Sequence, residues 1–335
     1  MLKQIKKYHI ISSIVLVVIT LSLVVFSQSI YATPLTDTTN QQQQQQQQLL
    51  SIVSTRDIPI FNLAQLTKLV DDTIEKFNTN KTCPSEIAIY IHGFNKNKDD
   101  AGEEFNRLQM SLNNNSYIIP LIGFSWDSKV SWEQAKINAQ KNGEELAKFI
   151  FKFKNKCSIT DIRIIAHSLG AAVVDSTLSN LVKYLDSKNT ADNHSKVIKS
   201  VHLLGAAINN ELITAKTSFG NAITDKVERF LNLYNPEDDG LEINRLIEKH
   251  NPLGSVGAPN QTIPKNYKDT NVMNEILAIS DADGDGNLEE CFEENGLVLK
   301  KGDNHCGYIG FREPFSNSLI DDGAIDVVVR DWGNS

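Results

Sequence analysis

Short apolar runs alternate with longer amphipathic runs along most of the chain. The apolar runs are typical of buried strands, and they span residues 86–94, 116–126, 161–168, 199–207 and 226–235. The amphipathic runs repeat their apolar positions at helical spacing, most clearly over residues 63–77, 131–153 and 169–185. Strands separated by helices predict a mainly parallel sheet with helices on both faces, so the expected fold class is α/β.

Four polar segments follow predicted strands, at the edge where such sheets bind ligands. They are HGFN (92–95), SWDS (125–128), HSLG (167–170) and NPEDDG (235–240). Ligands of open α/β sheets bind beyond the carboxyl ends of the strands. We therefore expect the functional site to be assembled from these loops.

Ser168 lies between a predicted strand and a predicted helix, in the stretch DIRIIAHSLG. That context is the strand, sharp turn and helix of a nucleophile elbow. The turn is strained, so the residues two before and two after the serine must be small, and they are Ala166 and Gly170. A serine at this position can instead simply cap the helix, so its partners must decide between the two interpretations.

A nucleophilic serine needs a histidine base and a carboxylate, in the chain order Ser, Asp or Glu, then His. The candidates after Ser168 include His194 in a polar loop, His202 within a strand, and His250 at the end of a charged segment. A role at a helix end is the simpler interpretation of His250. His305 lies in a loop after the last predicted strand, and we predict that it is the base.

The acid is expected where the strand 226–235 ends in carboxylates. Asp238 is the preferred candidate, and Asp239 and Glu237 are the alternatives, because only the side chain that faces His305 can serve. An aspartate at this position can also hydrogen-bond its own backbone within a turn.

An acyl-transfer site also needs two backbone N–H donors for the oxyanion. The residue after the nucleophile, Leu169, supplies the first. The loop after the strand 86–94 offers the second, because Gly93 permits a sharp turn that aims the amide of Phe94 at the substrate oxygen.

The same segments carry a resemblance to a known family. The series IHGFN, GFSWDS, IIAHSLG, LNLYNPEDDGL and NHCGYIGF resembles a poorly characterised family of α/β-hydrolase-fold proteins related to serine esterases and lipases, over residues 86–311. The resemblance implies a triad of Ser168, Asp238 and His305, with no cofactor required for the chemistry. The chain departs from the common G-x-S-x-G pattern at Ala166, which adds only a methyl group.

Four cysteines predict two disulfides in an exported chain. The resemblance makes the strands that follow Cys83 and Cys157 neighbours in the sheet, as the third and fifth strands are in α/β hydrolases. The implied pairing is therefore Cys83 with Cys157, which leaves Cys291 with Cys306.

Residues 281–293 form an acidic loop that follows the start of an EF-hand loop. Its expected calcium ligands recur at alternate positions: Asp281, Asp283, Asp285, Asn287 and Glu289. Phe292 occupies the twelfth position, where a bidentate glutamate is usual. Glu289, Glu290 or Glu293 would have to take its place, so the predicted calcium site is loose and weak. We expect calcium to stiffen the segment that presents His305. The alternative is an acidic turn exposed to solvent.

The first 57 residues differ from the rest of the chain. Residues 1–32 place three lysines before an apolar stretch and end in small residues, which predicts a signal peptide or an N-terminal membrane anchor. Residues 33–57 are a Gln-rich, low-complexity linker, and residues 58–335 are the predicted hydrolase domain. The expected location is outside the cytoplasm, secreted or tethered to the outer face of the cell membrane.

The net charge of −8 and the few basic clusters exclude a nucleic-acid-binding function. We predict an exported serine hydrolase of carboxylic esters, with a small-molecule or lipid ester as substrate. One alternative is a noncatalytic, calcium-dependent binding protein of the cell surface that retains the hydrolase scaffold. The other is an amidase or peptidase with the same triad.

Overall fold

The computed structural model describes residues 50–56, 61–77, 82–186, 196–276, 304–312 and 319–333. All of these belong to one compact unit, which begins at Gln48. The acidic loop 281–293 and the segment 1–32 lie outside the described residues, so their predicted roles stay predictions. None of the helices in the described part is long and apolar enough to cross a membrane.

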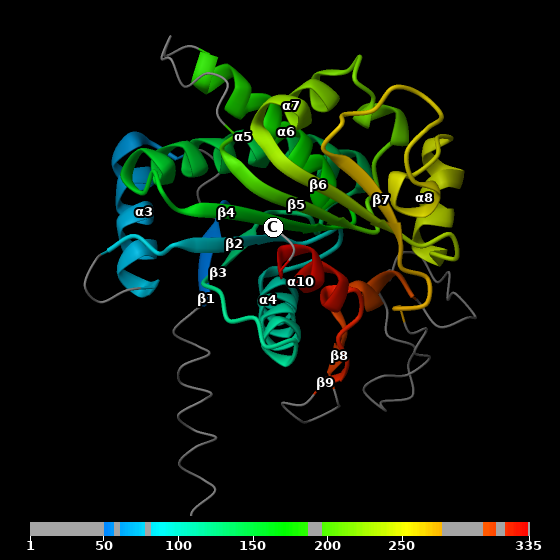
Figure 1. Cartoon of the computed structure of the whole chain (residues 1–335), viewed down its shortest axis with the longest axis horizontal. Coiled ribbons are helices and arrows are strands. Elements are labelled where there is room, and N and C mark those ends of the chain that lie inside the picture. The colour runs from blue at the N-terminus through cyan, green and yellow to red at the C-terminus, as the bar shows by residue number, and fades with distance from the viewer. Residues whose placement is uncertain are drawn as a thin grey trace, which may run out of the picture. The chain divides into compact units, whose positions relative to one another are not determined.

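A parallel sheet runs through the middle of the described part (Figure 1). Its strand order is β1-β3-β2-β4-β5-β6-β7, and every neighbouring pair is parallel. The strands are β1 (Leu50–Ser54), β2 (Glu86–Ile91), β3 (Leu121–Ser125), β4 (Asp161–His167), β5 (Ile198–Leu204), β6 (Val227–Tyr234) and β7 (Tyr267–Asn271). The predicted α/β class, with helices on both faces of a parallel sheet, is confirmed.

Each face of the sheet carries its own layer of helices (Figure 1). One layer contains α3 (Leu63–Phe77), α5 (Trp132–Lys156), α6 (Gly170–Asp186) and α7 (Ser218–Lys226). The other contains α4 (Lys98–Asn114) and α10 (Ile325–Gly333). The remaining elements are η1 (Asn210–Ile213), α8 (Asp239–Glu248), α9 (Leu253–Val256), η2 (His305–Ile309), β8 (Phe311–Arg312) and β9 (Leu319–Asp321).

The two layers explain why the strands read as continuous apolar runs. Along β2, Ile87 and Ile89 pack into the core under α5 and α6, whereas Ala88 and Tyr90 pack into the core under α4. Successive side chains of a strand point to opposite faces of the sheet. A strand that helices cover on both faces is therefore apolar at nearly every position.

The start of the folded domain corrects the sequence prediction. The linker was expected to extend over residues 33–57, but Leu50–Ser54 form β1 at the edge of the sheet. This strand pairs in register with β3, from Leu50 beside Leu121 to Ser54 beside Ser125. Its apolar residues Leu50 and Val53 are buried, and backbone pairing to β3 supplies hydrogen bonds that a polar linker lacks. The boundary at residue 57 is therefore wrong by at least one strand.

A disulfide joins Cys83 to Cys157, with Cα atoms 5.5 Å apart. It lies just before β2 and β4, which are parallel neighbours paired from Glu86 beside Asp161. This is the pairing expected from the sequence. Cys306 is also disulfide-bonded, and its expected partner, Cys291, lies outside the described residues.

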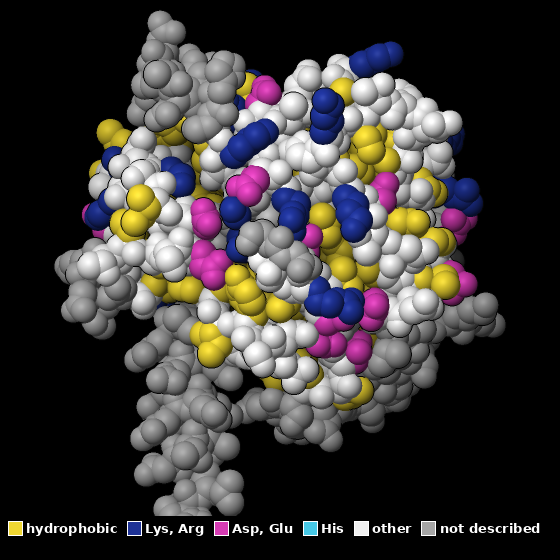
Figure 2. Space-filling view, viewed as in Figure 1, with side chains coloured by type: hydrophobic (Ala, Val, Ile, Leu, Met, Phe, Trp, Pro, Cys, Tyr) yellow, Lys and Arg dark blue, Asp and Glu magenta, His cyan; other side chains and the backbone are white. Residues whose placement is uncertain are grey.

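The visible surface carries charges of both signs. On the face shown in Figure 2, Lys and Arg side chains lie among Asp and Glu side chains and apolar patches. This face therefore lacks the continuous basic surface that binding to a phosphate backbone requires.

Candidate active site

Ser168 occupies the sharp turn between β4 and α6. Its φ is +53°, in the left-handed region that costs energy for any residue with a side chain. The turn is held by its backbone, because the N–H of Ser168 donates to Leu204 O at 3.0 Å and its carbonyl accepts from Ala207 N at 3.1 Å. Leu204 is the last residue of β5, and Ala207 lies just beyond it. These hydrogen bonds to the end of β5 therefore stabilise a backbone conformation that is unfavourable for an isolated serine.

Small residues make this turn sterically feasible. A Cβ atom added to Gly170 would lie 2.6 Å from the carbonyl oxygen of Ile91, so only glycine lets α6 start this close to β2. A Cβ added to Gly93 would lie 2.8 Å from Cβ of Ser168. Ala166 is fully buried in β4. The loop after β2 therefore packs directly against the serine.

Three segments far apart in the sequence bring Ser168, His305 and Asp238 together. His305 Nε2 lies 2.9 Å from Ser168 Oγ, and His305 Nδ1 lies 2.8 and 2.9 Å from the two carboxylate oxygens of Asp238. The three residues are only 1–2% exposed. In the neutral ring, a proton on Nδ1 donates to Asp238 and leaves Nε2 free to accept the hydroxyl proton of Ser168. This geometry allows proton transfer from the serine to the imidazole.

Asp238 is held by partners other than the histidine. It is the N-cap of α8, where its Oδ1 accepts from the backbone N–H of Leu241 at 2.8 Å. The hydroxyl of Tyr308 donates to its Oδ2 at 3.0 Å. Burial and the nearby carboxylate raise the pKa of Tyr308, so the phenol stays neutral and keeps donating.

Asp239, the alternative candidate for the triad acid, makes different contacts. Asp239 is the first residue of α8, and its backbone N–H donates to Asn304 Oδ1 at 3.1 Å. The amide of Asn304 also donates to the carbonyl of Glu237 at 2.5 Å. Asn304, which directly precedes His305, therefore ties the loop after β6 to the segment that carries the base.

His167, directly before the serine, supports the histidine from behind. Its Nε2 lies 2.8 Å from the carbonyl oxygen of His305, and the two rings are 4.8 Å apart. A carbonyl can only accept, so Nε2 of His167 carries the proton and donates. Burial, together with the neighbouring His305, lowers the pKa of His167 to about 3, so it remains a neutral donor near pH 7.

The roles of His167, Tyr308 and Asn304 were missed by sequence reasoning. Tyr308 and Asn304 flank His305 within a few residues, but nothing in their spacing indicates that they reach the loop after β6. His167 was placed only in the polar segment HSLG after a strand, which gives no sign of a contact with a segment more than a hundred residues away.

The two predicted oxyanion donors lie beside the serine. Leu169 follows it in the chain, and Phe94 follows Gly93, where an added Cβ would lie 2.8 Å from Cβ of Ser168. Phe94 is buried, and its ring meets Trp132 edge to face at 5.1 Å between centroids. Both residues therefore adjoin segments that pack at the elbow, and the role of their amides as oxyanion donors stays a prediction.

The loop that carries Phe94 is held by a second buried histidine. His92 Nε2 accepts from the backbone N–H of Trp126 at 3.1 Å and lies 3.2 Å from the guanidinium of Arg56. Two donors at Nε2 leave the proton on Nδ1, which donates to the carbonyl of Gly93 at 2.9 Å. Burial is the largest influence on the pKa of His92 and lowers it to about 4, so the ring stays neutral and keeps this tautomer near pH 7.

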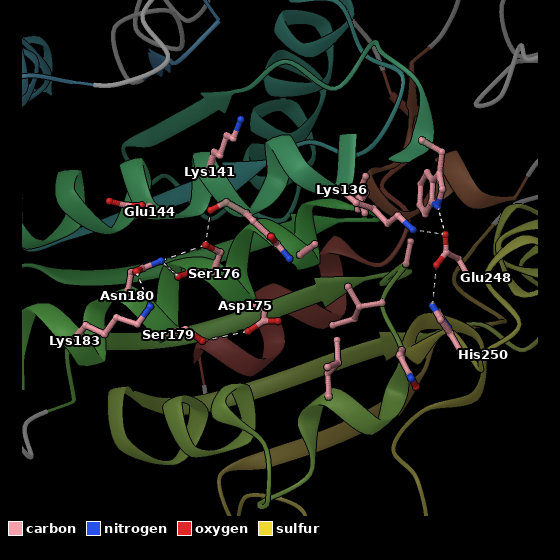
Figure 3. Close-up of a pocket in the computed structure, with 18 residues that line it drawn as sticks. Lys136, Lys141, Glu144, Asp175, Ser176, Ser179, Asn180, Lys183, Glu248 and His250 are labelled. Carbon is pink, nitrogen blue, oxygen red and sulfur yellow. Dashed lines mark hydrogen bonds and ion pairs between the residues drawn. The ribbon is translucent and has the colours of Figure 1, made fainter. Parts of the chain in front are cut away.

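A groove of about 540 Å³ opens beside the serine, between α5 and α6 (Figure 3). Leu169 and Ala207 line it next to the nucleophile, and Asp175, Asn180 and Lys183 line it along α6. A second pocket in the described part of the chain, lined by residues of β1 and α4, does not include Leu169.

The described residues hold no cluster of three or more His, Cys, Asp or Glu side chains that could bind a metal ion. The predicted calcium ligands, from Asp281 to Glu289, lie outside the described residues. Calcium binding therefore stays a prediction.

Comparison with solved structures returns proteins of low identity. An uncharacterized protein from Bacillus cereus is 13% identical, with a TM-score of 0.33, over 57% of this chain and 54% of that one. Phospholipase PlaB from Legionella pneumophila is 12% identical, with a TM-score of 0.30, over 46% and 39%. Lipase B from Aspergillus fumigatus is 9% identical, with a TM-score of 0.33, over 57% and 45%. The match spans about half or less of the length of each of these proteins.

No curated protein sequence matches the chain. A family model described as an alpha/beta hydrolase of unknown function matches residues 70–295, which is about two thirds of the 335-residue chain. The matched range contains all of the strands from β2 to β7 and the serine of the elbow. The chain therefore belongs to this family of α/β hydrolases of unknown function.

Proposed function

We propose that the protein is a serine hydrolase of carboxylic esters, in which Ser168 is the nucleophile, His305 the general base and Asp238 the acid that orients it. The observation that carries the proposal is the continuous hydrogen-bond chain from Ser168 through His305 to Asp238, buried at a strained elbow. A serine that only capped α6 would need neither the strained backbone nor a histidine with a buried carboxylate behind it.

The geometry supports a two-step reaction. His305 takes the hydroxyl proton as Ser168 Oγ attacks the ester carbonyl, and the amides of Phe94 and Leu169 stabilise the oxyanion. His305 then gives the proton to the departing alcohol, which leaves an acyl group on Ser168. Water, deprotonated by the same histidine, releases the acid and restores the serine. The chemistry uses no cofactor.

Labelling with a fluorophosphonate probe tests the proposal directly. The full chain, with its disulfides intact, is expected to be labelled covalently, and Ser168→Ala is expected to lose the label because the activated hydroxyl that attacks the phosphorus is removed. Ser176→Ala, which removes a serine of α6 outside the elbow, serves as the matched control and should be labelled like the parent. Equal labelling of the parent and Ser168→Ala, or none of a folded parent, would contradict an activated Ser168.

Replacing His167 tests how the base is held. His167→Phe removes the donor to the buried carbonyl of His305, and we expect kcat/KM for an activated ester to fall on the order of 10–100-fold, because a small misplacement of a catalytic group is costly. His167→Gln keeps an amide donor and should recover most of the rate. If the Phe and Gln variants lose the same activity at equal thermal stability, the hydrogen bond to His305 does not position the base.

We also infer that the protein acts outside the cytoplasm on a small-molecule or lipid ester, secreted or tethered by its first 32 residues. Two observations support this inference. The N-terminal segment has the pattern of an export signal, and the Cys83–Cys157 disulfide is typical of oxidising compartments.

A further inference from the structure

The groove between α5 and α6 includes Leu169, the residue after the nucleophile, and extends along α6 to Lys183 (Figure 3). Beside the nucleophile it is lined by Leu169, Ala172 and Ala207, and also by Trp132, whose ring N–H donates to the carboxylate of Glu248. Its far end is polar and includes Asp175, seven residues after Ser168 in the chain. At the rise of an α-helix, that separation corresponds to about 10 Å along the axis.

Asp175 differs from the other acids of the groove. Glu248 lies 2.7 Å from the ammonium of Lys136, and Glu144 lies 3.0 Å from that of Lys148. Asp175 accepts one long hydrogen bond, from the hydroxyl of Ser179 at 3.3 Å, and no cation among the described residues offsets its charge.

Folding therefore partly desolvates the carboxylate of Asp175, and no cation among the described residues compensates for this. Burial raises its pKa to about 6, and the weak hydrogen bond from Ser179 only partly opposes this shift. A half-buried carboxylate without a cation destabilises the free protein at neutral pH, and such groups in clefts are candidates for ligand recognition.

Hydrogen-bond donors lie on the same helix as Asp175. The ammonium of Lys183 donates to Asn180 Oδ1 at 3.3 Å, and Asn180 Nδ2 donates to the carbonyl of Ser176 at 2.8 Å. Lys183 carries no ion pair among the described residues, and in Figure 3 it lies at the Asn180 end of the groove. A ligand along α6 thus meets a carboxylate acceptor and an ammonium donor in succession.

This order of groups suits a neutral, hydroxylated ligand better than a cation or an anion. A hydroxyl both donates and accepts, so neighbouring hydroxyls can satisfy Asp175 and Lys183 together. A cationic ligand would leave the ammonium of Lys183 beside another positive charge, and an anionic one would face Asp175.

We propose that the groove binds the hydroxylated alcohol part of an ester, of the sugar or polyol class, and that Asp175 accepts hydrogen bonds from its hydroxyls. The inference rests on the proposed function, because the ester carbonyl must lie at Ser168 for the alcohol to enter this groove. Asp175 is then a specificity-determining residue for that reaction.

The test compares two acetates whose alcohols have similar length, cellobiose monoacetate and decyl acetate. Acetate is too small to reach Asp175, so only the alcohol samples the far end of the groove. The parent is expected to prefer the sugar ester in kcat/KM. Asp175→Asn should lower the ratio of sugar to decyl ester about tenfold or more, because a hydrogen bond to a charged group is lost.

Two further readouts separate recognition from structure. Asp175→Asn should keep or raise the thermal stability and keep fluorophosphonate labelling, because it removes a half-buried charge that no cation offsets, two helical turns beyond the nucleophile. Asp72→Asn, an exposed aspartate of α3 paired with Lys68, is the matched control and should leave the ratio unchanged.

The outcomes distinguish the two proposals. If the parent is labelled and cleaves both acetates, but Asp175→Asn leaves their ratio unchanged or lowers both rates equally, the groove inference is overturned and the serine hydrolase stands. A parent that prefers an ester of a cationic alcohol such as choline over both acetates also overturns it. If the folded parent is neither labelled nor active on any acetate, the proposed function fails and the inference falls with it.

Discussion

Asp238→Asn is expected to lower kcat for an activated ester by about 10⁴-fold, the size of effect known for loss of the triad acid in serine proteases. The asparagine amide would donate to His305 Nδ1, which forces the proton of the ring onto Nε2. That nitrogen could then no longer accept the proton of Ser168, from which it is 2.9 Å away. The fold should persist, because asparagine is as good an N-cap for α8 as aspartate.

The measurement is the steady-state hydrolysis of 4-nitrophenyl acetate, with the thermal midpoint followed in parallel. Asp239→Asn is the matched control, because the backbone of Asp239 begins α8 next to the acid while its own N–H is bound to Asn304. We expect this control to retain activity within a few fold. A large loss in Asp239→Asn with little loss in Asp238→Asn would assign the acid to the other register.

Replacing both Cys83 and Cys157 by serine is expected to lower the free energy of unfolding by about 4 kcal/mol, because the disulfide closes a loop with a sequence separation of 74 residues. The bond restricts the unfolded chain far more than it shapes the folded one. It also lies before the first residues of β2 and β4, whereas Ser168 follows the last residue of β4. The folded variant should therefore keep its kcat.

Urea unfolding of the parent and of the Cys83→Ser, Cys157→Ser double variant measures this difference. The double variant is preferable to reduction of the parent, because a reductant would also break the disulfide of Cys306. Unchanged stability would contradict the loop-entropy argument. A loss of kcat in the folded state would contradict the separation of the disulfide from the active site.

The sequence alone was sufficient for the local features of this fold. The runs that became β2 and β4 are apolar at nearly every position, because both faces of a parallel sheet are covered by helices. Ser168 was identified because a strained turn needs small neighbours at fixed offsets, and Ala166 and Gly170 satisfy that need within five residues. Such features depend on sterics between residues close in the chain, so a short stretch of sequence contains all the relevant information.

The end of the linker was predicted wrongly, because the strand that follows it depends on a distant partner. β1 contributes a single short edge strand directly after a glutamine tract, and only its pairing with β3 distinguishes it from the polar segment before it. An edge strand gains its hydrogen bonds from a partner that lies far away in the sequence.

Contacts between distant loops were decided by the tertiary structure. The sequence left Asp238 and Asp239 as rivals, because one residue of register at the start of α8 turns a side chain toward or away from His305. The support of His305 by His167 and of Asp238 by Tyr308 joins segments separated by 138 and 70 residues. The place of the Asp175 carboxylate in a groove likewise depends on the packing of α5 beside α6. These features depend on the relative placement of whole elements, which the burial of their apolar faces fixes and no local pattern encodes.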